Sequence, residues 1–459
     1  MLEPQIISIE DIDSVHMIGV GGAGMSGIAK LLAQRGIAVS GSDLKPSDVV
    51  DSLSGVGVET WIGHQPDRIG SVDVVVASSA VPEHDRELQA ARDAGIPTAR
   101  RPALLRGVTN AFSTIGFSGT HGKTTSTAMA VAALRACDRD PSFIVGGELT
   151  DLNTGAHLGD REVLLLEADE AFGTFRHLEL AALGVTNIEA DHLDYYRTVT
   201  ALEEAFAQVA GSSAGPVVGC IDDPGVRRLA ERATVIGYGT SDDAQWHVTD
   251  IDLGPKTSFS LTRNGTAHRV QLQHPGLHVV LNAAGVLALL GEVGFDLECA
   301  IAGLGEFRGV RRRFEVKARI EGVSIIDDYA HHPTEVASTV EAARTMTSGR
   351  LWVVFQPHRY TRTAGLAPAF GEPLARADRV IVTDVYGAGE QPQPGVTGRL
   401  VEEAVRAGGG NVEYIQHLAD VPPRLAGSLQ PGDTLILMGA GDVATIWTDV
   451  ADRLGAIRE

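Results

Sequence analysis

The segment Gly116–Ser126, GFSGTHGKTTS, contains residue types that bind phosphate. Gly122, Lys123 and Thr124 match the end of the phosphate-loop pattern, although Phe117 stands where the pattern has its first glycine. In such a loop the backbone N–H groups converge on an anion, the lysine reaches the β- and γ-phosphates, and the hydroxyl ligates Mg²⁺. The alternative is an ordinary glycine turn with an exposed lysine. The expected phosphate-binding residues are Gly119, Thr120, His121, Gly122, Lys123, Thr124 and Thr125.

A second glycine motif lies near the N-terminus, in HMIGVGGAGMSG. Its glycines follow the GxGxxG spacing after an apolar run, and Asp43 comes 19 residues after Gly24. This pattern fits a dinucleotide whose ribose lies near the aspartate. It fits equally well any nucleotide diphosphate held at a helix N-terminus, or a tight turn without a ligand.

Acidic residues and a histidine end two apolar runs of the middle part of the chain, VLLLEADE and LGVTNIEADHLD. Glu167 and His192 are therefore expected to face Lys123 at the edge of a sheet. A carboxylate is an ordinary Mg²⁺ ligand, whereas an imidazole is not. From its chemistry alone, His192 is equally well explained as a metal ligand or as a histidine with a structural role.

Four apolar runs of the last third of the chain also end in polar clusters. Because the carboxyl ends of parallel strands share one edge, these clusters are expected to line one crevice. The expected lining residues are Asp327, His331, Arg359, Arg362, Asp384 and Gly439. Arg359 and Arg362 could each bind a carboxylate with paired hydrogen bonds. Arg312 and Arg313 could clamp a phosphate or be surface charge, and Asn282 could cap a helix or contact a base.

Apolar β-branched runs alternate with Ala/Leu-rich segments along nearly all 459 residues, which predicts an α/β fold with mostly parallel sheets. This length is too great for one hydrophobic core. The expected domains are residues 1–107, 108–311 and 312–459.

The composition restricts the partners and the compartment. A net charge of −21 argues against nucleic acid or an anionic membrane as the main partner. The N-terminal segment is acidic, which does not fit a signal peptide, and no apolar run of about 18 residues predicts a membrane span. The cysteines Cys137, Cys220 and Cys299 fit no metal or disulfide framework, so we expect buried free thiols in a soluble cytoplasmic protein.

Seven motifs occur in the order typical of the Mur ligase family of peptidoglycan synthesis, which the chain resembles almost from end to end. They are GVGGAGMSGIA, GTHGKTT, TNIEADHLD, RRFE, DDYAHHPTEV, FQPHRYTRT and GAGD. The family's own phosphate loop reads GTHGKT, so Phe117 is no departure from it. The resemblance implies an N-terminal Rossmann-like UDP-binding domain, a central P-loop ATPase-type domain and a C-terminal Rossmann-like domain for the incoming amino acid.

The resemblance also implies an activity: ATP-dependent ligation of L-alanine to the carboxylate of UDP-N-acetylmuramate through an acyl phosphate. It implies Mg²⁺ at Thr124, Glu167 and His192, and the nucleotide at Asn282, Arg313 and Asp327 beside the phosphate loop. It places the UDP-sugar at Gly21, Gly22, Ala23, Gly24, Met25, Ser26, Asp43 and Ser79. It places L-alanine and the acyl phosphate at Tyr329, His331, Arg359 and Arg362. The catalytic residues that it implies are Lys123, His331, Arg359 and Arg362.

Three alternatives stay open. One is a nucleotide-switched binding protein without chemistry, which would bind ATP but release no phosphate. A recycling ligase of the same family joins a preformed tripeptide to the same UDP-sugar and shares the phosphate loop. An NAD-dependent oxidoreductase would explain the GxGxxG motif but would have no use for Lys123 or Glu167. Two local departures from the family pattern occur, at Ala171–Gly173 and at Val279, where the family has an asparagine.

Overall fold

The computed structural model of the chain describes residues 7–254 and 256–456. Residues 1–6, which belong to the acidic N-terminal segment, lie outside the described residues. The chain forms two compact units. The first comprises the residues up to Asp250, Phe259–Val270 and Leu281–Phe307, and the second comprises Ile251–Ser258, Gln271–Val280 and the residues from Arg308 onward.

The N-terminal sheet lies in the first unit and is parallel throughout. Its strand order is β3 (Glu59–Ile62), β2 (Ala38–Asp43), β1 (Ser14–Ile18), β4 (Val74–Ala77) and β5 (Thr98–Arg100). The order reverses between β1 and β4, and ligands of open α/β sheets bind where such a reversal occurs. The GxGxxG motif follows β1 and leads into α1 (Ala23–Arg35), which places it at this point.

The central sheet has ten strands in the order β15-β14-β13-β12-β11-β10-β6-β9-β7-β8. The strands around the phosphate loop are β10 (Ala182–Val185), β6 (Ser113–Ser118), β9 (Val163–Glu167) and β7 (Ser142–Leu149), which pair in parallel. The remaining strands are β8 (Thr154–His157), β11 (Val217–Cys220), β12 (Ile236–Gly239), β13 (Trp246–Asp252), β14 (Thr257–Arg263) and β15 (Thr266–Leu272).

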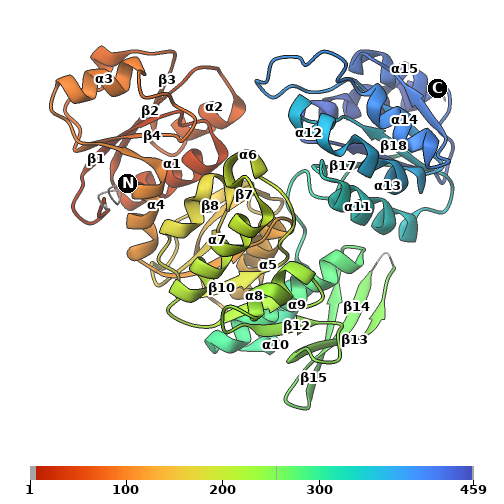
Figure 1. Ribbon diagram of the computed structural model, residues 1–459, viewed down its shortest axis with the longest axis horizontal. Coiled ribbons are helices and arrows are strands. Elements are labelled where there is room, and N and C mark those ends of the chain that lie inside the picture. The colour runs from red at the N-terminus through yellow and green to blue at the C-terminus, as the bar shows by residue number, and fades with distance from the viewer. Residues whose placement is uncertain (1–6, 255, 457–459) are drawn as a thin grey trace. The chain divides into compact units, whose positions relative to one another are not determined.

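Helices α5 (Lys123–Ala136), α7 (Val199–Ser212), α8 (Pro224–Ala230), α9 (Leu277–Val293) and α10 (Leu297–Glu306) accompany the central sheet (Figure 1). The apolar core of the first unit runs through both of its sheets. It joins residues such as Ile28 of α1 and Leu164 of β9. The glycine motif and the phosphate loop therefore belong to one packed body.

The C-terminal sheet has the order β16-β17-β21-β18-β19-β20. These strands are β16 (Glu315–Ile320), β17 (Val323–Asp328), β21 (Thr434–Met438), β18 (Leu351–Phe355), β19 (Arg379–Val382) and β20 (Val412–Tyr414). Only β16 pairs antiparallel among them. Successive residues of β18 point into two separate apolar clusters, Val353 into one and Val354 into the other. Both faces are covered by helices, which are teal to blue in Figure 1, as a buried parallel sheet requires.

The expected α/β class with mostly parallel sheets is confirmed, with one sheet for each expected domain. The domain boundaries at 107/108 and 311/312 stay predictions. The expectation of free thiols is wrong for two of the three cysteines, because Cys137 and Cys299 form a disulfide, while Cys220 is free and buried. No described helix is both long and apolar enough to cross a membrane.

Candidate active site

The phosphate loop connects β6 to α5. Its backbone takes left-handed values at Gly119 (φ 129°) and Gly122 (φ 84°). A Cβ atom at Gly119 would lie 2.1 Å from the Thr186 hydroxyl, so only glycine fits there. No side chain caps the N-terminus of α5. An uncapped helix N-terminus of this kind leaves its first N–H groups available, which suits it to binding an anion.

Lys123 is the central charge of this loop. Its side chain is buried, and its Nζ lies 2.8 Å and 3.0 Å from the two carboxylate oxygens of Glu170. Asp169 Oδ1 is 3.5 Å from the same nitrogen. Burial alone would lower the pKa of Lys123, but the charges of Glu170, Asp169 and Glu167 outweigh it and raise this pKa, so the ammonium stays charged.

Three groups suited to metal binding gather beside Lys123. One ligand atom from each of Asp169, Glu170 and His192 lies within 4.8 Å of the others. Glu167, the acidic residue expected here, also acts on Lys123 electrostatically, but one of its oxygens accepts the Gly146 N–H at 2.6 Å. Sequence reasoning missed Asp169 and Glu170. Their position directly after β9, in the run EADE, is the signal that could have identified them.

Two asparagines hold the other side of the loop. The Asn187 side chain accepts the N–H of His121 at 2.8 Å and donates to its carbonyl at 3.1 Å. Asn282, in α9, is buried, and its Oδ1 lies 2.6 Å from where a Cβ of Gly122 would be. Asn282 therefore lies against the phosphate loop, although 160 residues separate it from Gly122 in the sequence.

The N-terminal glycine motif contacts Asp43 directly. The Gly21 N–H donates to Asp43 Oδ2 at 3.0 Å, at the carboxyl end of β2. Of the other residues expected in this site, Met25 and Ser26 are buried in α1, Ser79 is exposed beyond β4, and the side chain of Ala23 lies outside the described part of the chain.

Arg101 brings positive charge to this glycine motif and was missed by sequence reasoning. A Cβ at Gly24 would lie 2.0 Å from Arg101 Nη1, so the guanidinium lies directly over the start of α1. Its Nη2 donates to Thr174 Oγ1 at 3.0 Å. The residue follows β5 directly, at the same sheet edge as Asp43, and this position is the signal that could have identified it.

In the second unit, an aromatic cluster gathers at the carboxyl edge of the C-terminal sheet. The ring centroids of Tyr329 and His331 are 5.3 Å apart, and those of His331 and His358 are 5.7 Å apart. His358 stacks on Tyr386 at 5.8 Å. Burial lowers the pKa of His331 and lowers that of His358 to about 3, so both imidazoles are neutral at pH 7.

The four arginines of this sheet edge differ in their contacts with the rest of the second unit. The guanidinium groups of Arg312 and Arg313 lie over the Tyr329 ring, at 5.1 Å and 4.9 Å from its centroid. Arg312 also donates to the carbonyls of Gly439 and Gly441. Arg359 is exposed and directly precedes α12 (Tyr360–Leu366) with φ 68°, and Arg362 lies in the first turn of that helix.

Asp327 is a buried carboxyl at the end of β17, 3.5 Å from Arg312 Nε. Burial raises its pKa to about 6 from 3.8, against the opposing charge of Arg312. The folded protein therefore favours the protonated form. The stability that this group contributes is complete below pH 3.8 and is lost as pH rises through about 6. A shift of this size corresponds to about 3 kcal/mol.

Asp327→Asn, which keeps the shape of the side chain without its charge, should therefore gain stability relative to the wild type as pH rises from 4 to 7. Thermal unfolding of both proteins at several pH values measures this difference. The matched control is Asp452→Asn, an exposed carboxyl of α16 (Trp447–Ala456). A difference between the Asp327→Asn variant and the wild type that is constant with pH would contradict the assigned burial effect.

Three family models match successive parts of the chain. They are the Mur ligase family catalytic domain over residues 14–113, the Mur ligase middle domain over residues 117–290, and the Mur ligase glutamate ligase domain over residues 312–441. The chain belongs to the Mur ligase family. Its glycine motif, phosphate loop and C-terminal aromatic cluster fall within the first, second and third of these segments.

This Mur ligase has relatives that match it over nearly the whole length. It is 43% identical to the UDP-N-acetylmuramate–L-alanine ligase of Mycolicibacterium vanbaalenii, with 97% of each chain covered. It is 42% identical to the enzyme of the same name from Acidothermus cellulolyticus, with 98% of this chain and 96% of that one covered.

Solved structures agree with the fold of this Mur ligase. The UDP-N-acetylmuramate–alanine ligase of Thermotoga maritima superposes with a TM-score of 0.82 at 26% identity, covering 97% of this chain and all of that one. The murein peptide ligase of Psychrobacter arcticus gives a TM-score of 0.69 at 22% identity, covering 97% and 99%, which supports the fold alone.

Proposed function

We propose that this protein is a cytoplasmic ATP-dependent ligase that joins L-alanine to the carboxylate of UDP-N-acetylmuramate, the first amino-acid addition to the peptidoglycan precursor. The observation that carries the proposal is the buried Lys123 of the phosphate loop, paired with Glu170, which belongs to a cluster of groups suited to metal binding. It occurs in a chain that is 43% identical over 97% of its length to a relative of that name. A dehydrogenase would have no use for this arrangement.

ATP is proposed to bind at Gly119–Thr125, with the Lys123 ammonium against its phosphates and Asn282 beside the adenine. Arg313 and Asp327 are the nucleotide contacts proposed from the second unit. The donors near Lys123 fit Mg²⁺, because Asp169 and Glu170 offer the carboxylate oxygens that this ion prefers. Thr124, Glu167 and His192 are the other proposed ligands. When bound, Mg²⁺ neutralises phosphate charge.

The UDP-sugar is proposed to bind at the N-terminal glycine motif, in the residues Gly21, Gly22, Ala23, Gly24, Met25, Ser26, Asp43 and Ser79. The N-terminus of α1 has no side-chain cap and offers N–H groups to a diphosphate. Arg101 adds the positive charge that a protein of net charge −21 must gather locally to bind such a ligand. Asp43 is proposed to contact the ribose.

Charge explains why these groups are needed. The substrate carboxylate must approach the γ-phosphate of ATP, and two like charges about 4 Å apart repel by about 4 kcal/mol even at an effective dielectric constant of about 20. Lys123 and the arginines reduce this repulsion and hold the two anions in position. The carboxylate oxygen then bonds to phosphorus while ADP leaves, and the amine nitrogen of L-alanine displaces phosphate from the acyl carbon.

The amine must lose a proton, and His331 is the proposed base. Its Nδ1 lies 3.0 Å from the Tyr329 carbonyl oxygen, which can only accept, so Nδ1 carries the proton of the neutral ring. Nε2 is therefore the lone-pair nitrogen. The lowered pKa of this half-buried imidazole keeps Nε2 unprotonated at pH 7. Tyr329, Arg359 and Arg362 are proposed to surround the L-alanine carboxylate and the acyl phosphate.

Phosphate release with ATP, Mg²⁺, UDP-N-acetylmuramate and one amine at a time tests this function. We expect L-alanine to give the highest kcat/KM, with no release when either UDP-N-acetylmuramate or the amine is omitted. Turnover with the tripeptide L-alanyl-γ-D-glutamyl-meso-diaminopimelate but not with L-alanine would assign the recycling reaction instead. ATP binding without phosphate release in any mixture would contradict a ligase.

A further inference from the structure

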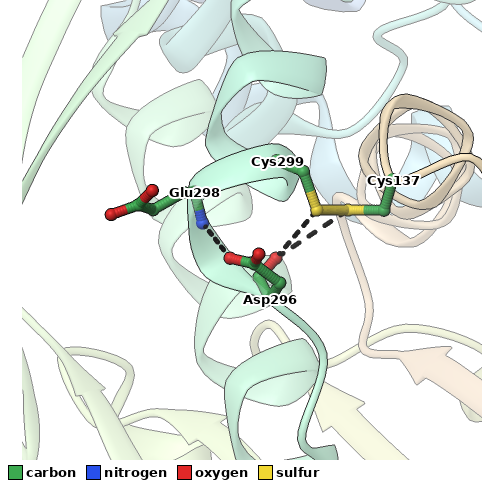
Figure 2. Close-up of a disulfide and its surroundings, with 4 residues drawn as sticks. All are labelled: Cys137, Asp296, Glu298 and Cys299. Atoms are coloured by element: carbon green, nitrogen blue, oxygen red, sulfur yellow. Dashed lines mark hydrogen bonds between the residues drawn. A yellow bond between two sulfur atoms is a disulfide. The ribbon is translucent and has the colours of Figure 1, made fainter.

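We infer that Cys137 and Cys299 form a reversible redox site that cross-links the nucleotide-binding domain and sets its resistance to unfolding, without changing the rate of ligation. Figure 2 shows the disulfide between the end of α5 and the first turn of α10. The two Cα atoms are 5.2 Å apart, within the ordinary range for disulfides, although 162 residues separate the cysteines in sequence.

The pair is accessible to soluble thiols. The residues Cys137 and Cys299 are partly exposed, and their neighbours Asp138, Asp296 and Glu298 are exposed. Cys220, the remaining cysteine, is buried, and its burial raises its pKa to about 12, which keeps it as an unreactive thiol at neutral pH. Exchange chemistry is therefore confined to one pair.

The reduced state is also accommodated by the structure. The Asp296 carbonyl oxygen lies 3.3 Å from Cys299 Sγ and 3.8 Å from Cys137 Sγ, as the dashed lines in Figure 2 mark. After reduction, this oxygen is an acceptor for the proton of either thiol. The Asp296 side chain caps α10 by accepting the Glu298 N–H at 2.8 Å, which fixes the carbonyl at the helix start.

Packing holds the two helices together without the bond. At Gly303 of α10, a Cβ atom would lie 2.5 Å from the Ala132 backbone oxygen and 2.8 Å from the Ala136 Cβ. The helix backbones are thus in close contact one turn away from the sulfurs. Opening the disulfide leaves this contact intact, so its main effect is to release the restraint on the unfolded chain.

The disulfide lies at the opposite end of α5 from the phosphate loop. Lys123 begins α5 and Cys137 follows its last residue. At a rise of about 1.5 Å per residue, the helix places them about 20 Å apart. Because the same helix packing serves both redox states, the phosphate loop keeps its position when the bond opens. We therefore expect a change in stability with turnover preserved.

The exchange is balanced with soluble thiols alone. A thiolate of the reductant attacks one sulfur of the disulfide and forms a mixed disulfide, which releases the other cysteine as a thiolate. A second reductant thiol displaces the first cysteine. The net reaction converts one protein disulfide and two thiols into two protein thiols and one small disulfide. An oxidised small disulfide closes the pair by the reverse steps.

The test uses the full chain equilibrated with oxidised glutathione or with dithiothreitol. Thiol titration of the denatured protein should find one thiol in the first case and three in the second, since the chain has three cysteines. Intact mass distinguishes the internal disulfide from glutathione adducts. The oxidised protein should melt about 5–15 °C higher than the reduced protein, while kcat for phosphate release should agree within about twofold.

The double variant Cys137→Ser/Cys299→Ser should show no redox-dependent melting shift, whereas Cys220→Ala should keep it. Three titratable thiols after oxidation, glutathione adducts in place of the internal bond, or a shift that persists in the double variant would overturn the assignment. A tenfold difference in kcat between the two redox states of the wild type would overturn the separation from catalysis. The thiol and melting readouts do not depend on the proposed ligase activity.

Discussion

Lys123→Ala should lower kcat for phosphate release by about 10³-fold. The ammonium is the one lysine charge at the phosphate loop, and the chain has only five lysines in all. Removing a single preorganised charge from a phosphoryl-transfer site costs about 10²–10³-fold in rate. The loss is expected to be at the upper end here, because the acidic residues around Lys123 would then repel the triphosphate without an opposing cation.

The same substitution should also reduce stability, since it leaves Glu170 as a buried carboxylate without its cation. Breaking such a pair costs about 3 kcal/mol or more. Lys123→Ala/Glu170→Gln removes both charges and should recover part of the lost stability without recovering turnover. This double variant separates a folding defect from a catalytic one.

The matched control for this experiment is Lys256→Ala, which removes an exposed lysine. Its kcat should equal that of the wild type. Near-normal turnover of Lys123→Ala, or equal losses in the two lysine variants, would remove Lys123 from the proposed chemistry.

The parts of the fold that follow local rules were predictable from the sequence. Apolar runs ending in polar clusters predicted parallel strands with functional residues at one edge, and β6, β9 and β17 end in this way. Gly122 and Lys123 were assigned to a loop before a helix because glycine and the helix start determine that geometry within a few residues.

Contacts between distant residues were not predictable in the same way. The positions of Asp169 and Glu170 after β9 are local, but that Glu170 pairs with Lys123 depends on β6 and β9 being neighbours in the sheet. The cysteine pair depends on how α5 packs against α10. Strand order and helix packing arise from the whole core, and no spacing within a motif encodes them.

Arg359→Gly should abolish most activity while preserving stability. Arg359 has φ 68° and ψ 136°, which is unfavourable for any residue with a side chain and acceptable for glycine. The backbone is held there because the Arg359 N–H donates to the Tyr386 carbonyl at 2.8 Å. Strained residues of this kind cluster at functional sites, where the structure around them maintains the strain.

Two opposing effects decide the stability of this variant. Relief of the backbone strain is worth about 1–3 kcal/mol, and the greater freedom of glycine in the unfolded chain costs about 0.5–1 kcal/mol. The melting temperature of Arg359→Gly should therefore equal or exceed that of the wild type. Arg359→Ala keeps a Cβ atom and hence the strain, so it should melt below the glycine variant.

Both variants lose the guanidinium that we propose to bind the L-alanine carboxylate or the acyl phosphate. Losing such a charged contact costs about 10²–10³-fold in kcat/KM for L-alanine. The loss should be the same in the Arg359→Gly and Arg359→Ala variants. Steady-state phosphate release and thermal unfolding of the two variants measure both effects. If Arg359→Gly melts no higher than Arg359→Ala, the backbone at residue 359 carries no strain; if either variant keeps wild-type kcat/KM, the guanidinium does not bind the substrate. We propose that the unfavourable backbone at Arg359 lowers stability while it positions the guanidinium, and the glycine variant measures how large this loss of stability is.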